Sequence, residues 1–183
     1  MDETFQHLYD HYHHDVFQFL FYMVKNREQA EDLTQEVYIR VLKSHQQFEG
    51  RSSEKTWLIS IARHVAIDYF RKQKTLKQRI LDKFDWEKNQ IKDSGQLPEE
   101  IALQNEQIRL IYQALDYCTV DQRSVVILRY IQGLSISEAA QALDWTESKV
   151  KTTQHRAVKS LKKKMEEITT EKEGVKDEKI RME

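Results

Sequence analysis

The chain has 183 residues, of which 39% are hydrophobic and 32% are charged, and its formal net charge is -1. This length allows one medium-sized domain or two small ones, and the near-neutral total charge by itself indicates no partner. Only four glycines and one proline are present, which excludes a fold built from many short hairpins. The single cysteine, Cys118, excludes an internal disulfide, and we expect it to be a small buried apolar residue.

The distribution of apolar residues argues against a membrane protein. No uninterrupted apolar run is long enough to cross a bilayer, and the polar, acidic start of the chain is not typical of a signal peptide. We therefore expect a cytoplasmic protein without direct membrane insertion. Apolar residues instead recur at helical spacing along most of the chain, which predicts an all-α fold.

Two segments near the N-terminus carry apolar stripes. Residues 4–24 and 28–44 both place apolar side chains at three- and four-residue steps, as amphipathic helices do. Only residues 25–27 connect the two segments. We therefore expect two helices that pack antiparallel.

The helical period breaks at residues 48–55. Gly50 permits a turn there, and Ser52 or Ser53 can cap the helix that follows. That third helix is expected from about Thr56 to Lys74, and its far end is basic.

Charge and composition divide the rest of the chain. Residues 75–104 mix charged residues with the only proline, which favours a linker. Its apolar side chains are too many for a free tether, so we expect part of it to dock: Ile80, Leu81, Phe84 and Trp86. The predicted organisation is two small helical domains, 1–74 and 105–165, joined by the linker 75–104 and followed by a charged, disordered tail, 166–183.

The stretch from Gln132 to Lys164 has the pattern of a helix-turn-helix. A short helix, a tight turn and a second helix follow one another, and Thr146 can cap the second helix. On one side of that helix, Val150, Ala157 and Leu161 are expected to pack on the first helix, whose small alanines allow close approach.

The opposite side of the second helix is basic. From Asp144 to Lys164 there are seven basic and two acidic side chains. Clustered bases release counterions from a phosphate backbone, and Arg156 or Gln154 can also read base edges in the major groove. A basic face alone is often merely solvated; the tight turn and the small packing residues favour DNA binding. The residues expected to face DNA are Ser148, Lys149, Lys151, Thr152, His155, Arg156 and Lys159.

Three motifs occur in a fixed order. The first is Ala30-Glu-Asp-Leu-Thr-Gln-Glu-Val-Tyr38, and the second runs from Phe48-Glu-Gly-Arg-Ser-Ser through Trp57 to Arg71-Lys72. The third runs from Asp121-Gln-Arg123 to the basic helix. On these motifs, the chain resembles the bacterial RNA polymerase sigma factors of the sigma-70 family, in the extracytoplasmic-function (ECF) subfamily. The resemblance implies a promoter-specificity subunit that needs no cofactor and is not an enzyme.

The first motif is similar to the family's region 2.2. The resemblance implies that this helix docks on the clamp helices of the β′ subunit of core polymerase. One face of the helix, opposite its apolar stripe, then supplies the polymerase core-binding residues Asp32, Gln35, Glu36 and Ile39. A polar face with one apolar residue suits docking on another protein, although an isolated helix would more often leave such a face solvated.

The second motif is similar to regions 2.3 and 2.4, which in this family capture the melted minus-ten element. An irregular loop before a helix offers backbone N–H groups, hydroxyls and an arginine to a flipped base. The expected minus-ten DNA-binding residues are Gly50, Arg51, Ser52, Ser53, Lys55, Arg63, Arg71 and Lys72. Trp57 can stack on a base, but its place on the apolar stripe favours a role in the core.

The third motif is similar to region 4, which reads the minus-thirty-five element and contacts the flap of the β subunit. Asp144 stands where the turn often has glycine, and His64 stands where asparagine is frequent. Thr153 and Val158 replace frequent arginines, so we expect this helix to have its own base preference.

Promoter DNA and a membrane-anchored anti-sigma factor, active in a cell-envelope stress response, are the further partners that the resemblance implies.

Two other classes of function are weaker alternatives. His7, His11 and His14 lie at helical spacing near Asp15, and such a group can bind zinc. No cysteine or carboxylate set completes that site, so we expect no metal. A repressor that uses only the helix-turn-helix would need a ligand pocket or a dimer interface in its N-terminal half, where this chain has the first two motifs instead.

Overall fold

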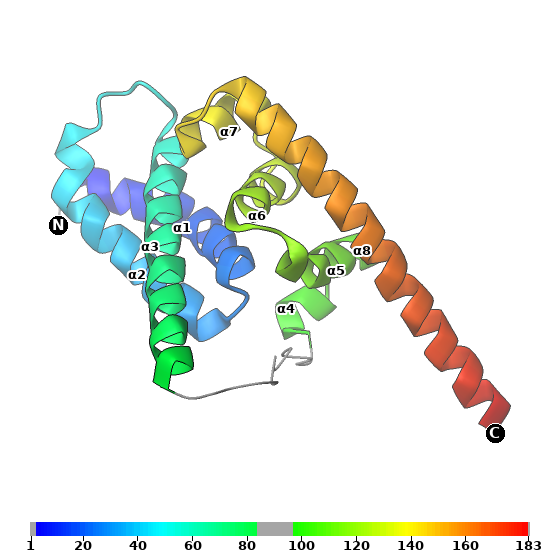
Figure 1. The fold of residues 1–183 in the computed structure, drawn as a ribbon. Coiled ribbons are helices and arrows are strands. Elements are labelled where there is room, and N and C mark those ends of the chain that lie inside the picture. Colours follow the sequence, from blue (N-terminus) through cyan, green and yellow to red (C-terminus); the bar gives the residue numbers. More distant parts are fainter. Residues whose placement is uncertain (1–2, 84–96, 183) are drawn as a thin grey trace.

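The structure, a computed structural model, describes residues 3–83 and 97–182, with side chains over 3–79 and 97–174. Every regular element in these ranges is helical, which confirms the all-α prediction. Helices α1, α2 and α3 form an N-terminal bundle, and the remaining helices form a second unit beside it (Figure 1). A long C-terminal helix, α8, extends away from the body of the protein.

The N-terminal bundle consists of α1 (Glu3–Val24), α2 (Arg27–Ser44) and α3 (Glu54–Lys83), which all pack on one another. The predicted short connection is present, because α2 begins immediately after Asn26. The side chain of Asn26 accepts a hydrogen bond from the backbone N–H of Gln29 at 2.9 Å and so caps the helix. Lys25 adopts a left-handed φ of +56°, which turns the chain sharply between the two helices.

The linker begins later than the sequence predicted, because α3 does not end at Lys74 but continues to Lys83. The added segment contains leucine, lysine, glutamine and arginine, which are good helix formers, and no glycine or proline interrupts it. A short helix, α4 (Glu99–Ala102), follows Pro98 within the predicted linker. The expected docking of Ile80, Leu81, Phe84 and Trp86 lies outside the side chains that the structure describes.

The second unit starts with α5 (Glu106–Ala114) and a 3₁₀ turn, η2 (Leu115–Tyr117). It continues with α6 (Val120–Val126), a π-helical turn, η3 (Ile127–Ile131), and the helix-turn-helix pair α7 (Ile136–Leu143) and α8 (Glu147–Met182). These short helices depend on side-chain caps. Thr119 and Ser135 both form capping boxes, with Gln122 and Glu138, which satisfy the first free N–H groups of α6 and α7.

The expected disordered tail is helical instead, since α8 runs to Met182. The first part of the tail contacts α5, because Lys172 donates a hydrogen bond to Gln113 at 3.3 Å. Just before the tail, Lys164 lies over the ring of Tyr117 at 4.2 Å. Because glutamate and lysine are good helix formers, a charged segment without an apolar stripe can still continue a helix that is already nucleated.

The two units share one hydrophobic core. Helix α3 packs against α7, while α1 contacts both α6 and the π-helical turn. Phe19, Leu20, Leu58, Leu115 and Leu128 are fully buried members of this core. The second unit therefore lies directly on the bundle in this structure.

Close packing of α7 leads to a stability prediction. Ala139 is fully buried in α7, which packs against both α3 and α8. The substitution Ala139→Leu should lower the free energy of unfolding by about 1–3 kcal/mol, because the core has no room for three more carbons. Urea denaturation measures this loss. Gln141→Leu, at an exposed position of the same helix, is the control, and an equal loss in both variants would contradict the explanation.

Candidate functional site

The exposed face of α2 carries the four residues predicted to bind core polymerase. Asp32, Gln35 and Ile39 are exposed, with Ile39 at 47%, and Glu36 is half-buried. Glu36 accepts a hydrogen bond from Arg40 at 2.9 Å, and Arg40 also reaches Asp68 of α3 at 3.2 Å. The structure therefore places these side chains on one surface and fixes Glu36 through α3.

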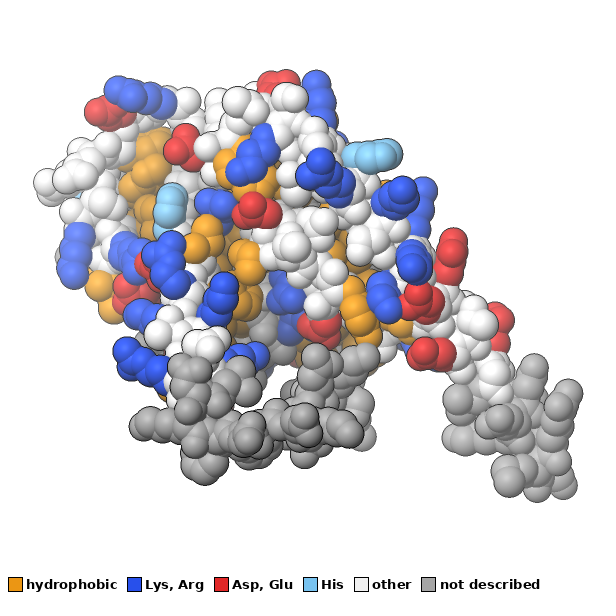
Figure 2. Space-filling model, in the orientation of Figure 1, with side chains coloured by type: hydrophobic (Ala, Val, Ile, Leu, Met, Phe, Trp, Pro, Cys, Tyr) orange, Lys and Arg blue, Asp and Glu red, His pale blue; other side chains and the backbone are white. Residues whose placement is uncertain are grey.

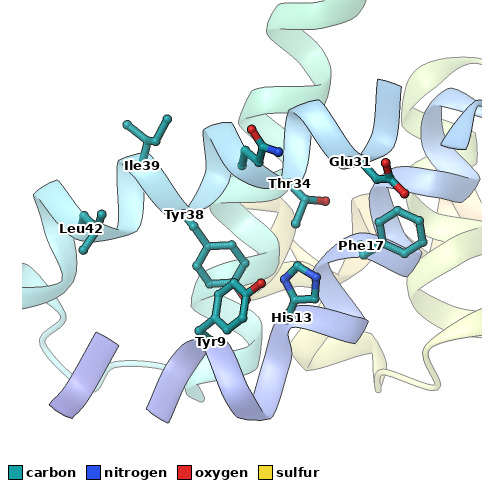
Figure 3. A pocket seen from close by; sticks show the side chains of 9 residues that line it. Tyr9, His13, Phe17, Glu31, Thr34, Tyr38, Ile39 and Leu42 are labelled. Atoms are coloured by element: carbon teal, nitrogen blue, oxygen red, sulfur yellow. The ribbon is translucent and has the colours of Figure 1, made fainter. Parts of the chain in front are cut away.

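A groove between α1 and α2 extends this surface (Figure 3). Its volume is about 530 Å³. Tyr9, Ile39 and Leu42 are large apolar side chains that remain 38%, 47% and 50% exposed around it. The sequence motif missed the contribution of α1, because Tyr9, His13 and Phe17 lie far from it along the chain. The lining residues are Tyr9, His13, Phe17, Glu31, Thr34, Gln35, Tyr38, Ile39 and Leu42.

Two polar atoms in this groove are buried without a hydrogen-bond partner among the described residues, the Tyr38 hydroxyl and His13 Nδ1. The rings of His13 and Tyr38 lie 5.8 Å apart, and the Tyr9 ring packs on both, at 4.5 and 4.9 Å. Burial raises the pKa of Tyr38 and lowers the pKa of His13, so both groups are neutral at pH 7. The floor of the groove is therefore aromatic and uncharged.

The lowered pKa of His13 makes stability depend on pH. In the unfolded chain the imidazole keeps its ordinary pKa, so between the folded and unfolded values the unfolded state binds more protons. The His13 contribution to stability is complete above the unfolded pKa and is lost as the pH falls through this window. Acidification from about pH 7.5 to about pH 5.5 should lower the melting temperature of the wild type more than that of His13→Gln. Equal losses in both proteins, measured by circular dichroism, would contradict this.

The minus-ten loop was predicted over residues 48–56, but α3 already begins at Glu54, so the loop itself is residues 48–53. It turns at Gly50, whose φ is +68°. Of the two serines considered as caps, Ser53 is the one used: it accepts a hydrogen bond from the Thr56 N–H at 3.1 Å, and α3 begins at Glu54. Gly50 and Arg51 are exposed, and Ser52 is half-buried. The loop therefore presents backbone groups, hydroxyls and one arginine to solvent.

Side chains of α1 and α3 support this loop from behind. Glu54 accepts a hydrogen bond from the Tyr12 hydroxyl at 3.1 Å and pairs with His7 Nε2, also at 3.1 Å. Lys55 lies 3.3 Å from Asp15. The ring of Trp57 packs at 5.1 Å on Phe48, where the loop begins, and Trp57 is half-buried, as its place on the apolar stripe suggested.

Arg63 differs from the other basic residues predicted to meet the minus-ten DNA. Arg71 and Lys72 are exposed on α3, whereas Arg63 is only 9% exposed. Its guanidinium lies 3.5 Å from Asp121 and 5.3 Å from the centre of the Trp145 ring, both in the second unit. The expectation that Arg63 is available for DNA is therefore wrong for this arrangement, because the packing of the two units covers it.

The recognition helix presents its predicted DNA face to solvent. All seven expected residues are exposed, and basic side chains gather along the first half of α8 (Figure 2). Val150, Ala157 and Leu161 are buried, as predicted, and the Thr146 hydroxyl accepts a hydrogen bond from the Lys149 N–H at 3.2 Å. The exposed residues are Ser148, Lys149, Lys151, Thr152, His155, Arg156 and Lys159.

The turn before this helix uses an aspartate in a glycine-like conformation. Asp144 has a left-handed φ of +54°, which aspartate tolerates better than most residues. The Lys149 ammonium lies 3.9 Å from the centre of the adjacent Trp145 ring. Gln154, considered as a reader of base edges, instead accepts a hydrogen bond from Arg129 at 2.9 Å and is half-buried. It is therefore a packing residue in this structure.

Over the residues that the structure describes, no group of three histidine, cysteine or carboxylate side chains is placed to hold a metal ion. His7 and His11 lie close, with ring centres 4.1 Å apart, but His7 is paired with Glu54. No helix in the described part of the chain is long and apolar enough to cross a bilayer.

Each of the two units matches a known family model. Residues 8–75 match the model of sigma-70 region 2, and residues 108–161 match that of sigma-70 region 4. The chain therefore belongs to the sigma-70 family of RNA polymerase sigma factors.

Several of its relatives are ECF sigma factors. The chain is 63% identical, over all of its length and 93% of the relative's, to the ECF RNA polymerase sigma factor SigX of Bacillus subtilis (strain 168). It is 32% identical to the RNA polymerase sigma factor YlaC of the same organism, covering 89% of this chain and 92% of that one. The resemblance predicted from the motifs is confirmed.

A solved structure supports the fold. The sigma factor RpoE of Bartonella quintana, in complex with the anti-sigma factor NepR, superposes with a TM-score of 0.70 and 19% identity. The match covers 90% of this chain and 98% of that one.

Proposed function

We propose that this ECF sigma factor binds core RNA polymerase through the α1–α2 groove and holds promoter DNA at two separate elements. Loop 48–53 and the exposed basic side chains of α3 would bind the melted minus-ten strand. Helix α8 would lie in the major groove of the minus-thirty-five duplex. The seven exposed residues of α8, on a helix that caps and packs as a helix-turn-helix requires, are the observation that carries this proposal.

The groove suits a partner helix. It combines exposed apolar side chains with one carboxylate, that of Glu31 on α2, and protein interfaces commonly have an apolar centre and a polar edge. A clamp helix of the β′ subunit is the occupant that the family implies. The flap of the β subunit is the second polymerase contact that we propose, for the C-terminal unit.

The minus-ten loop, residues 48–53, suits a flipped base. Extruding a base costs a few kcal/mol, which hydrogen bonds from the loop must offset. Gly50, Ser52 and Arg51 offer such groups in an exposed segment, while the contacts of Glu54 and Lys55 hold the start of α3 in place. Arg71 and Lys72, which are exposed further along α3, would contact phosphates.

The regulation that we propose is inhibition by an anti-sigma factor, anchored in the membrane, in a response to envelope stress. Support comes from the related fold of RpoE, which is held in complex with the anti-sigma factor NepR. In this proposal the protein acts in the cytoplasm. Mapping transcription starts after overproduction of the protein would identify its promoters.

The function is tested by adding the purified chain to core polymerase and promoter DNA found by such mapping. We expect initiation at those promoters and a stable complex with core polymerase. Absence of both would contradict the proposed function, because a sigma factor must support each of them.

Ile39 tests the groove. The substitution Ile39→Asp should weaken core binding by about 1.5–3 kcal/mol, because a charge replaces an apolar side chain that is buried on docking. Ile39→Leu keeps the apolar surface and should bind as the wild type does. Affinity is measured with labelled core polymerase, and unchanged binding of Ile39→Asp would exclude this face.

Arg156 tests the recognition helix. If it reads a base, Arg156→Ala should cost about 1–3 kcal/mol in promoter affinity and relax the preference at one position of the minus-thirty-five element. Lys172→Ala removes the same charge from α8 outside this face and should have a much smaller effect. Equal effects of the two substitutions would indicate a general electrostatic contribution only.

A further inference from the structure

Arg129, in the π-helical turn η3, contacts both halves of the helix-turn-helix. Its Nε donates a hydrogen bond to the side-chain oxygen of Gln154, on α8, at 2.9 Å. Its Nη1 donates another to the backbone carbonyl of Leu134, the residue just before the N-cap of α7. Both Arg129 and Gln154 are half-buried. One planar guanidinium therefore joins the entry of α7 to the part of α8 expected to lie on DNA.

The turn between η3 and α7 is itself fixed to η3. Gly133 has a left-handed φ of +69°, and the Leu134 N–H donates a hydrogen bond to the carbonyl of Leu128 at 2.9 Å. Since the Leu134 carbonyl accepts from Arg129, both backbone polar groups of Leu134 are bonded to η3. Single π-helical turns occur mainly at functional sites, and this one supplies a rigid base for the Arg129 side chain.

The packing of α8 on α7 is apolar and cannot define the rotation of α8 as closely. Val150 and Ala157 are fully buried, and α7, against which α8 packs, contributes buried alanines. Burial of such small side chains holds the helices together without a preferred direction, whereas a hydrogen bond weakens steeply away from its best angle. Among the residues that the structure describes, Arg129–Gln154 is the side-chain hydrogen bond that joins residues 147–163 to another element.

The rotation of α8 matters because its DNA face is read as a unit. Thr152, His155 and Arg156 lie within two residues of Gln154 along the helix and are exposed, while Gln154 faces the body of the unit. Successive residues are about 100° apart around a helix, so a small rotation moves all of these side chains together. Base readout requires hydrogen bonds of defined length and angle, which such a rotation would disturb at several base pairs at once.

We propose that Arg129 is a positioning residue for promoter recognition, which acts through Gln154 to set the rotation of α8 in the major groove. The inference rests on the minus-thirty-five function proposed above and adds a specificity determinant that does not itself touch DNA. A residue that reads a base affects one base pair, whereas a positioning residue affects the discrimination at several.

Four substitutions test the role of this contact. Gln154→Leu removes the acceptor on α8 and leaves Arg129 bonded to Leu134, while Arg129→Gln removes the guanidinium itself. Gln154→Glu keeps an acceptor and should form a charge-assisted hydrogen bond with Arg129. Gln141→Leu makes the same chemical change as Gln154→Leu at an exposed position of α7 and is the control. Thermal unfolding followed by circular dichroism shows that each variant is folded; if Arg129→Gln is not, Gln154→Leu decides.

Discrimination is measured with core polymerase carrying each variant. The affinity for a mapped minus-thirty-five duplex is divided by the affinity for each duplex with one substituted base pair. In Gln154→Leu and Arg129→Gln this ratio should fall roughly threefold to tenfold at several base pairs, as expected for one lost hydrogen bond. Gln154→Glu and Gln141→Leu should keep the wild-type ratios, since a general change in charge or stability alters both affinities alike.

Two results would overturn the positioning role. The first is unchanged ratios in folded Gln154→Leu. The second is a loss confined to a single base pair, because Gln154 would then read that base itself. Failure of the proposed minus-thirty-five function would appear differently, since the wild-type protein would then not discriminate among the duplexes at all.

Discussion

The arrangement of the two units depends on the hydrogen bonds that the buried guanidinium of Arg123 donates. This group donates to a carbonyl at the end of α1 and to another at the 3₁₀ turn after α5, so it joins the bundle to the second unit from within. A buried cation must find acceptors. The Met23 carbonyl lies in the last turn of α1, where carbonyls have no partner within the helix. The Leu115 carbonyl also accepts a hydrogen bond from the Cys118 N–H at 3.1 Å. Together with the shared hydrophobic core, this contact holds the second unit on α1 and α3, where the second unit covers Arg63.

Short, capped elements position the functional surfaces within each unit. Helix α7 has only eight residues, and its capping box with Ser135 and Glu138 offsets the cost of so short a helix. The left-handed turn at Asp144 and the cap at Thr146 then set the direction in which α8 leaves the turn. In the bundle, the cap at Ser53 and the contacts of Glu54 fix the direction in which the chain passes from the minus-ten loop, residues 48–53, into α3. These capping and turn residues are exposed or half-buried, so hydrogen bonds near the protein surface position the functional surfaces.

Much of this was predictable from the sequence, and the failures have physical reasons. Helical periodicity identified the first two helices, and the buried stripe of Val150, Ala157 and Leu161 was correctly assigned, because burial follows directly from spacing. The extension of α3 and the helical tail were missed, since charge and lack of an apolar stripe say little about a helix that has already begun. Contacts distant in sequence, such as Arg63 with Trp145 or Tyr9 with Tyr38, leave no local signal. The roles of the individual DNA and polymerase contacts stay predictions.

The central claim is that one chain holds two promoter elements at once through two distinct surfaces. Footprinting of core polymerase with this protein, on a single mapped promoter, tests it most directly. The account predicts protection of the minus-thirty-five duplex together with single-strand reactivity at the minus-ten element, both lost without the protein. Protection at only one element, with initiation unimpaired, would contradict it.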